Sequence, residues 1–446
     1  MLRLSRQWLV PALFLALPLA AQTTRVIGYA QDGRTTIEAR VAPGYSGTGG
    51  TLLIGGLDGA AAAGSADVVI SLANPLKATL QFPPTGVPYK EHAESWTLWR
   101  WIQFHQPTEI KIQGADPDGL RSALAQRPAP GPQRSPIEVA RQLATVYGHD
   151  FNQLTYLPGM ALISQMRLGN VDAVAKLAEP YLTRDTLNRA SSLTLAGHMV
   201  FAELARRTKD PRYTTLVKKV GDLGFDEAGA MRESMPYHTE MSDSFFMAGP
   251  ITAMAGTLTG DRKYFDMVAK HFRFMQTLTL RSDGLYRHSP LVDTAWSRGN
   301  AFPALGMALA LSEFPKDHPE RGYVLGEYQK LMTTLARYQD PDGMWHEIID
   351  EPGSYPETSA TSMIATAMLR GIRQGWLDAS YQARVDRAWR AVLLRTNPDG
   401  TLLDVCESTN KMPTREDYLY RGPSNGKDER GGGMMLLFAT ELAGLQ

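Results

Sequence analysis

The sequence predicts a mainly α protein, an (α/α)6 barrel or six-hairpin toroid, preceded by a small α/β domain. From Pro136 onward, helical patterns come in six pairs, each with one amphipathic helix and one that is apolar on all sides. A helix with a charged face lies outside, and an all-apolar helix is buried. Asp-Gly turns recur at Asp283, Asp342 and Asp399. Helix-pair repeats indicate a toroid or a solenoid, and a closed toroid is favoured because the repeats stop at six.

The N-terminus has the pattern of a secretory signal peptide over residues 1–21. Arg3 and Arg6 precede an apolar run from Trp8 to Leu19, and Ala20-Ala21 stand before Gln22. A basic stretch, a short apolar stretch and small residues at the cleavage point define such a peptide. We therefore expect export to the periplasm or the extracellular space, with an uncleaved anchor as the alternative. No later segment is long and apolar enough to be a membrane helix.

Residues 22–125 are predicted to form the small α/β domain. Short β-rich runs bounded by glycine predict strands, and a Pro-rich stretch marks a domain boundary. The predicted strands are Thr51–Ile54, Val68–Ile70 and Glu109–Ile112, the predicted helix is Glu91–Phe104, the linker is 126–135, and the barrel domain is 136–446.

Each barrel pair is predicted to contain an outer helix followed by an inner one. Tyr381–Arg395 shows the amphipathic pattern and Ala301–Leu311 the apolar one. The Asp-Gly turns follow outer helices, and such dipeptides supply the positive φ of a tight turn. The predicted pairs are 137–147 with 157–167, 170–182 with 192–206, 212–223 with 243–258, 262–279 with 298–313, 319–338 with 357–374, and 379–394 with 431–445.

Composition excludes several classes of function. Lys+Arg and Asp+Glu both number 46, and no basic stripe or tail occurs, so no nucleic-acid partner is expected. Cys406 is the only cysteine, so no intrachain disulfide forms, and a buried packing role is expected for it. His346-Glu347 lacks the second histidine of a His-Glu-x-x-His zinc motif. We therefore expect no metal and no cofactor.

Polar and aromatic residues precede the inner helices. All inner helices of such a barrel run the same way, so their N-termini gather at one end. A carboxylate there meets unpaired N–H groups and the positive end of a helix dipole, as a site for a sugar acid requires. The residues concerned are His238, Asp243, His288, Asp293, Trp296, Arg298, Asn300 and Glu357, with Ser191-Ser192 at the second inner helix.

Residues 136–446 resemble the unsaturated uronyl hydrolases of glycoside hydrolase families 88 and 105. The resemblance implies an (α/α)6 barrel whose substrate is an oligosaccharide with a terminal 4,5-unsaturated uronic acid, the product of a polysaccharide lyase. The motifs that carry it are Tyr237-His238 through Asp243 with Phe246-Met247-Ala248 and Pro250, Asp283-Gly-Leu-Tyr-Arg-His288, Trp296-Ser-Arg-Gly-Asn300, and Glu357-Thr-Ser-Ala360.

The resemblance also implies roles for these residues. Asp243 matches the catalytic acid, which protonates C4 of the double bond before water adds at C5. Arg298 is expected to grip the uronate carboxylate. The expected substrate-binding residues are His238 and His288 through hydrogen bonds, Trp296 and Phe302 through stacking, and Asn300, Glu357 and Ser192.

Each of these residues also has a plainer interpretation. An aspartate at a helix start is usually an N-cap, and an arginine near a tryptophan is usually a stacking residue. His238 and His288 fit core histidines, and Glu357 fits a cap. The chain also departs from its relatives, which often carry an aspartate where Ser192 stands, with Asp185 as a possible substitute. Asn300-Ala301-Phe302 replaces the commoner Asn-Gly-Trp.

The N-terminal domain is similar to the first part of a zinc carboxypeptidase domain. The similar segments are Ile27–Arg34, Leu52–Gly59, Phe82-Pro-Pro and Glu94–Trp101. Such domains need His-x-x-Glu zinc ligands, and Asp58-Gly59-Ala60-Ala61 stands at those positions. The resemblance therefore implies a relic with a structural or glycan-presenting role.

Two rival functions remain open at this point. The first is hydrolysis of a saturated glucuronide, which needs two carboxyls about 5–9.5 Å apart; Asp243 with Glu357 or Asp293 would supply them. The second is non-catalytic glycan binding, which the loss of the usual aspartate at Ser192 favours.

Overall fold

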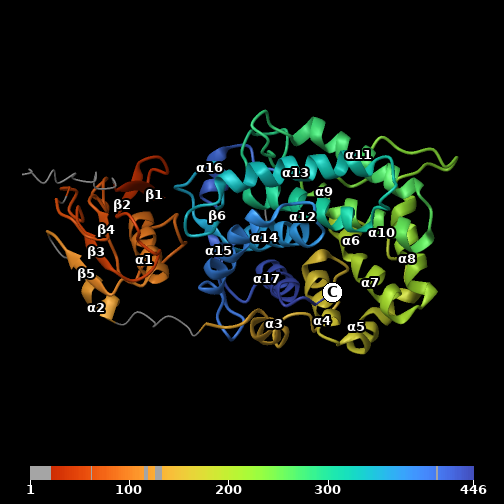
Figure 1. The fold of residues 1–446 in the computed structure, drawn as a ribbon, viewed down its shortest axis with the longest axis horizontal. Coiled ribbons are helices and arrows are strands. Elements are labelled where there is room, and N and C mark those ends of the chain that lie inside the picture. The colour runs from red at the N-terminus through yellow and green to blue at the C-terminus, as the bar shows by residue number, and fades with distance from the viewer. Residues whose placement is uncertain (1–21, 62, 115–118, 126–132, 408–409, 446) are drawn as a thin grey trace, which may run out of the picture.

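The computed structural model describes residues 22–61, 63–114, 119–125, 133–407 and 410–445. An N-terminal α/β domain, red to orange in Figure 1, lies at one end of a larger helical domain. The predicted signal peptide at 1–21 and residues 126–132 of the predicted linker lie outside the described residues.

The N-terminal domain is built on a five-stranded sheet in the order β1-β2-β4-β3-β5. β1 and β2, and β2 and β4, pair antiparallel, whereas β3 pairs parallel with β4 and with β5. The three predicted strands are confirmed as β3, β4 and β5, and the predicted helix as α1. The elements are β1 (Thr23–Tyr29), β2 (Thr36–Val41), β3 (Thr51–Ile54), β4 (Val68–Ile70), α1 (Ala93–His105), β5 (Glu109–Ile112) and α2 (Leu120–Ala125).

The β1–β2 hairpin was not predicted. Only Ile37, Ala39 and Val41 of β2 are buried, and they alternate with Glu38 and Arg40. Three buried positions, one of them an alanine, are a weak period-2 signal, so this edge of the sheet depends on tertiary packing.

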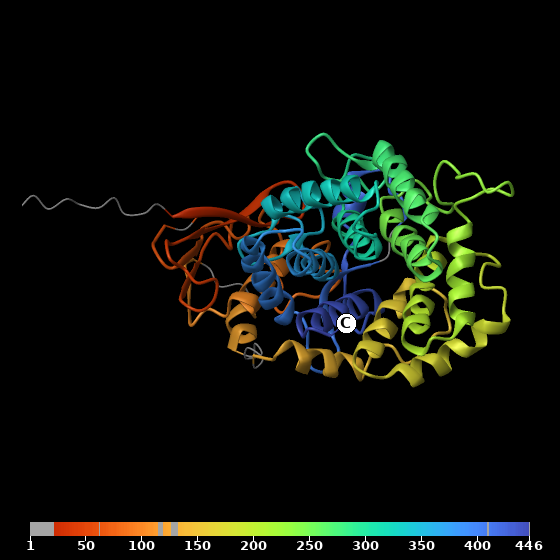
Figure 2. The same ribbon diagram turned by 45° about the vertical axis from the view of Figure 1, so that its right-hand side comes forward.

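The helical domain is an (α/α)6 barrel, as predicted, and Figure 2 shows its helices arranged in a ring. The last inner helix packs against the first, which closes the ring. The outer elements are α3 (Pro136–Ala144), α5 (Val171–Ala178) with η1 (Glu179–Thr183), α8 (Pro211–Asp222), α11 (Lys263–Thr279), α13 (Arg321–Tyr338) and α15 (Gln382–Leu393) with η2 (Ala379–Tyr381). The inner elements are α4 (Tyr156–Arg167), α6 (Ser192–Gly197) with α7 (Met199–Thr208), α9 (Ser244–Met247) with α10 (Gly249–Thr259), α12 (Ser297–Glu313), α14 (Thr358–Arg373) and α17 (Glu429–Leu442).

Two inner helices are interrupted where the sequence predicts continuous ones. The second breaks at His198 and the third at Ala248. Pro250 lies in the first turn of α10, where its missing N–H is tolerated, although the same residue disfavours a continuous helix through this point. The third inner helix therefore begins with the short segment α9, which follows its N-cap residue Asp243.

The loops at the inner-helix N-termini hold two short sheets and a short helix that the sequence does not predict. A pattern of two to five residues is too short to show a strand period. The Asp-Gly turns are confirmed, because Gly284, Gly343 and Gly400 have φ of +88°, +107° and +86°. The added elements are β6 (Trp345–His346) with β7 (Pro356–Glu357), β8 (Leu402–Cys406) with β9 (Pro423–Gly426), and α16 (Arg415–Leu419).

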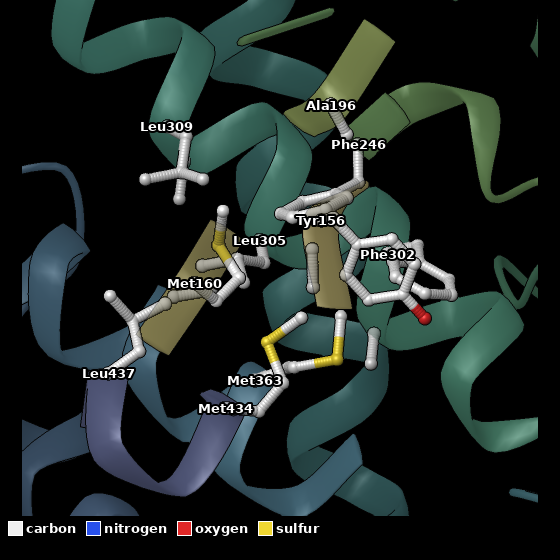
Figure 3. Packing of buried hydrophobic residues seen from close by; sticks show 14 of the residues in the cluster. Tyr156, Met160, Ala196, Phe246, Phe302, Leu305, Leu309, Met363, Met434 and Leu437 are labelled. Atoms are coloured by element: carbon white, nitrogen blue, oxygen red, sulfur yellow. The ribbon is translucent and has the colours of Figure 1, made fainter. Parts of the chain in front are cut away.

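Apolar side chains fill the middle of the barrel. Figure 3 shows Met160, Leu305 and Met434, from three different inner helices, packed together. Tyr156, Phe246 and Phe302 form an aromatic group beside them. Because packed side chains occupy the interior, a site for a sugar must lie at one end of the barrel rather than along its axis.

The N-terminal domain docks on the loops at the inner-helix N-termini. Arg100 of α1 lies 3.4 Å from the fully buried carboxylate of Asp404, which Arg395 of the barrel approaches to 3.7 Å. Arg100 also donates to the Asn425 side chain at 2.8 Å. Tyr89 stacks on Tyr355 with ring centroids 5.3 Å apart. The docked domain thus touches the segments that border the predicted site.

Cys406, predicted to be a packing residue, is buried and free. Among the described residues, none of the helices combines the length and the apolarity that crossing a membrane requires.

Candidate active site

Asp243 lies at the N-terminus of α9, and 15% of its side chain is exposed. Its Oδ2 atom is 3.2 Å from Nε2 of His288, a fully buried residue. The two atoms are close enough for an ion pair but not aligned as a hydrogen bond, and among the described residues neither has another hydrogen-bond partner. Asp243 does not cap α9 with its side chain, so the carboxyl is left for another use.

Tyr418 holds the other side of the His288 ring. The Tyr418 hydroxyl lies 2.8 Å from His288 Nδ1 and accepts a hydrogen bond from the Met412 N–H at 3.2 Å. Because the Met412 N–H already donates to the hydroxyl oxygen, we assign the Tyr418 O–H as the donor to His288 Nδ1. This assignment leaves the imidazole proton on Nε2, facing Asp243.

Trp296 lies between His288 and a buried glutamate. Its ring centroid is 4.5 Å from that of His288, and its indole N–H donates to Glu347 Oε1 at 3.0 Å. Ser297 Oγ and Cys406 Sγ also donate to this carboxyl. Burial, followed by the charge of Glu357, raises the pKa of Glu347 to about 8. Glu347 is therefore a neutral acid at pH 7, sealed beneath the indole.

Arg298 is buried next to Trp296, with its guanidinium 5.1 Å from the indole ring. Its Nη1 donates to the Cys406 carbonyl at 2.9 Å and its Nη2 to the Glu407 carbonyl at 2.8 Å. A bidentate grip on a uronate carboxylate therefore requires the remaining N–H groups or a movement of residues 406–407. The expected carboxylate-binding role stays a prediction.

Tyr156, the first residue of α4, was missed by the sequence analysis. Its ring packs edge-on against Phe246 and Phe302, and its hydroxyl has no hydrogen-bond partner among the described residues. Burial raises its pKa to about 12, the positive charge of Arg298 lowers it and the negative charge of Asp243 raises it. A search of the first residue of every inner helix, and not only of the charged ones, would have found it.

Three predicted substrate-binding residues are buried and have their polar groups bonded or their rings packed within the fold. Asn300 is fully buried and uses its amide to bond the backbone of Tyr286 and Trp296. Phe302 is buried in the aromatic group of Figure 3, with both neighbouring rings covering it. The substrate-binding roles expected for these two residues stay predictions.

Glu357 is the third of these residues, and it is the N-cap of α14. Its carboxylate accepts from the backbone N–H groups of Ser359, Ala360 and Cys406. The alternative interpretation of Glu357 as a cap is therefore confirmed. Its fully buried carboxylate is occupied by these bonds.

In the described part of the chain, neither His238 nor Ser192 makes a hydrogen bond or ion pair with Asp243. His238 is half-buried, packs edge-on against Phe274 and accepts from the Glu240 N–H; burial lowers its pKa. Ser192 begins α6, while Ser191 supplies the cap. Their substrate-binding roles stay predictions.

The other candidate acids lie away from Asp243. The Asp293 side chain is 64% exposed and pairs with Arg287, and Asp185 is exposed and accepts from the Leu187 N–H in its own turn. Within the described ranges, no cluster of histidine, cysteine, aspartate and glutamate is arranged to hold a metal ion. Asp243 is thus the partly exposed carboxyl beside His288, whose ring in turn packs near Trp296.

A partly exposed acid near aromatic and basic groups, at the inner-helix end of the barrel, suits acid catalysis on a bound ligand. The comparisons with known proteins agree. The family model of Glycosyl Hydrolase Family 88 matches residues 169–446, more than half of the chain. The chain belongs to this family.

Two characterised relatives are similar to the barrel. The unsaturated rhamnogalacturonyl hydrolase YesR of Bacillus subtilis is 29% identical over 241 residues, covering 50% of this chain and 68% of that protein. An unsaturated 3S-rhamnoglycuronyl hydrolase of an Alteromonas species is 25% identical over 290 residues, covering 60% of this chain and 68% of that protein.

Solved structures support the fold alone. A family 105 glycoside hydrolase from Clostridium acetobutylicum has a TM-score of 0.61 at 19% identity, covering 70% of this chain and 100% of that one. A possible family 105 member from Klebsiella pneumoniae has a TM-score of 0.60 at 19% identity, covering 74% of this chain and 99% of that one.

Proposed function

We propose that this protein removes a terminal 4,5-unsaturated uronic acid from oligosaccharides that polysaccharide lyases produce. Asp243 gives its proton to C4 of the double bond, and the positive charge that develops at C5 is shared with the ring oxygen. Water then adds at C5 and returns a proton to the Asp243 carboxylate. The C5–O5 bond of this hemiketal opens to a ketone, and the new hemiacetal at C1 releases the remaining sugar chain.

The environment of Asp243 suits this cycle, in which one carboxyl serves first as acid and then as base. Its partial exposure gives a sugar access, and Nε2 of the buried His288 lies 3.2 Å from Oδ2. The aromatic rings of Trp296 and Tyr156 provide an apolar wall near the developing charge.

The observation that carries the proposal is the contrast between Asp243 and the other candidate carboxyls at this end of the barrel. Glu357 is occupied as a cap, Glu347 is sealed beneath Trp296, and Asp293 is on the surface. Hydrolysis of a saturated glucuronide needs two working carboxyls. Hydration of a double bond needs one, which supports the unsaturated substrate.

The relatives narrow the choice of substrates to test. Both are named for unsaturated uronyl groups linked to rhamnose, so we propose digests of pectin and ulvan as the first substrates and digests of glycosaminoglycans as the comparison. Unsaturated uronides absorb in the near ultraviolet, and hydration of the double bond removes that absorbance.

The test is to incubate the protein with each digest and follow the absorbance and the sugars released. We expect the absorbance to fall with at least one digest, and Asp243→Asn to abolish the fall. Release of saturated glucuronate instead would establish the first rival function. Binding to the oligosaccharides without any turnover would establish a glycan-binding protein, and either result overturns the proposal.

We also propose that the protein is exported, because residues 1–21 have the basic and apolar pattern of a signal peptide. Expression of the full chain with a C-terminal tag, followed by cell fractionation and N-terminal sequencing, tests this. A mature protein that begins near Gln22 in the periplasm or medium is the expected result, and an unprocessed cytoplasmic protein contradicts it.

A further inference from the structure

A groove lies between the barrel and the N-terminal domain, and the family model does not match the N-terminal domain. Its volume is about 580 Å³, within the usual size of a small-ligand site. One wall is formed by the 86–90 loop of the N-terminal domain, and the other by Glu407, Met412 and residues from 417–423 of the barrel. The lining residues used below are Val87, Pro88, Lys90, Glu407 and Met412.

The groove adjoins the candidate active site through two sets of hydrogen bonds. The Glu407 carbonyl accepts from Arg298 Nη2 at 2.8 Å. The Met412 N–H donates to Tyr418, whose hydroxyl lies 2.8 Å from His288 Nδ1. Residues of the groove are therefore one hydrogen bond away from Arg298 and two hydrogen bonds away from His288, which makes the groove a direct neighbour of the candidate site.

The 86–90 loop is seated firmly against the barrel. A Cβ atom added at Gly422 would lie 2.2 Å from Val87 Cγ1, which shows how closely the valine approaches the backbone there. Even so, 40% of Val87 is exposed. The valine therefore presents an apolar surface to the groove from a fixed position, together with Pro88 and Met412.

The polar groups of the groove suit hydroxyls better than a polyanion. Lys90 and Arg421 are balanced by Glu407 and Asp417. Within the described part of the chain, the ammonium of Lys90 has no ion-pair or hydrogen-bond partner. A pyranose offers both an apolar C–H face and hydroxyls that donate and accept, which matches a lining that mixes apolar, cationic and anionic groups without an excess of charge.

The chemistry of the substrate fixes which sugars reach this groove. A residue with a C4–C5 double bond carries no sugar at C4, so the rest of the oligosaccharide continues from C1, the side that leaves. We propose that the groove binds the leaving-group sugars beyond the unsaturated uronate, so that the N-terminal domain takes part in substrate selection. This inference rests on the proposed function.

The experiment compares substrates of two lengths, an unsaturated disaccharide and an unsaturated tetrasaccharide purified from the digest that the wild-type protein turns over. In Lys90→Ala we expect kcat/KM for the tetrasaccharide to fall about 5-fold, mainly through KM, as lost ground-state binding predicts. In the double variant Val87→Ser with Lys90→Ala we expect kcat/KM for the tetrasaccharide to fall about 10-fold. The disaccharide should change much less, because it places fewer sugars in the groove.

Lys77→Ala is the matched control, because Lys77 is another exposed lysine of the N-terminal domain outside the groove. It should leave both substrates unchanged. Equal losses on both lengths, or no loss on the tetrasaccharide, overturn the inference while turnover of the disaccharide upholds the proposed function. A wild-type protein that turns over neither substrate overturns both.

Discussion

Two carboxyls on either side of Trp296 have opposite environments. Asp243 is partly exposed at the end of the barrel and faces the buried ring of His288, whereas Glu347 is fully buried and bonded to Trp296, Ser297 and Cys406. Burial raises the pKa of Glu347 to about 8, which on its own would make it look like a general acid. The comparison teaches that a catalytic acid needs access to a substrate as well as a suitable environment.

The largest effect should come from the accessible carboxyl. Asp243→Asn keeps the size of the side chain and removes the transferable proton, so we expect kcat to fall about 1,000-fold, within the usual range for losing a general acid. Asp293→Asn, which changes a surface aspartate near the same end of the barrel, is the control and should retain activity. Activity in Asp243→Asn within 10-fold of wild type would place the acid elsewhere.

The sealed carboxyl should matter to stability rather than to chemistry. The folded pKa of Glu347 lies above the unfolded value of 4.5, so the folded protein holds the proton longer and the free energy of unfolding falls as pH rises from about 4.5 to about 8. Each pKa unit is about 1.4 kcal/mol. Glu347→Gln removes this titration, and we expect its melting temperature to exceed that of wild type by roughly 5 °C at pH 8.5. Equal pH dependence in the two proteins would refute the assignment.

Glu357→Gln should destabilise the protein, whereas Glu347→Gln should stabilise it, and the effect should be smaller. It weakens the cap of α14 and the bond to the Cys406 N–H, so we expect a loss of about 2 kcal/mol of unfolding free energy, as for a charged hydrogen-bonding group. Chemical denaturation at pH 7 measures it. A Glu357→Gln variant that is more stable than wild type would contradict this, because it would show that the buried Glu357 carboxyl lowers the free energy of unfolding, as that of Glu347 does.

The smallest effect should come from the residue that orients His288. Tyr418→Phe removes the hydroxyl that bonds His288 Nδ1, and the loss of one hydrogen bond, about 1 kcal/mol, predicts a fall in kcat of about 5-fold. Tyr264→Phe is the control, since that hydroxyl donates to Asp222 away from the site. An unchanged kcat in Tyr418→Phe would mean that packing alone orients the imidazole.

The sequence predicted the barrel well because its signal is long and repeated. Each inner helix is apolar all round and each outer helix amphipathic, a pattern that 3.6-residue periodicity makes visible. It also located Asp243 and the residues nearest to it, His288, Trp296 and Arg298, since all four stand at or just before inner helices. By contrast, Asn300 and Phe302 stand in similar positions and are bonded or packed within the fold, which the pattern alone does not distinguish.

The residues that the sequence missed come from irregular segments. Tyr418 belongs to the five-residue helix α16, and Glu347 follows the two-residue strand β6. Such segments are too short for a period, and their contacts with His288 and Trp296 bridge 130 and 51 positions of the chain. Only a three-dimensional structure brings these partners together.

The buried carboxylate of Asp404 is shared by Arg100 of one domain and Arg395 of the other. Removing one partner of such a group leaves a charge without compensation in the interior. A substitution of one of these residues is therefore expected to require a compensating substitution in the other domain. Among homologues that keep both domains, we expect the residues aligned with positions 100, 404 and 425 to change together, so that their covariation records how long the two parts have been inherited as one enzyme.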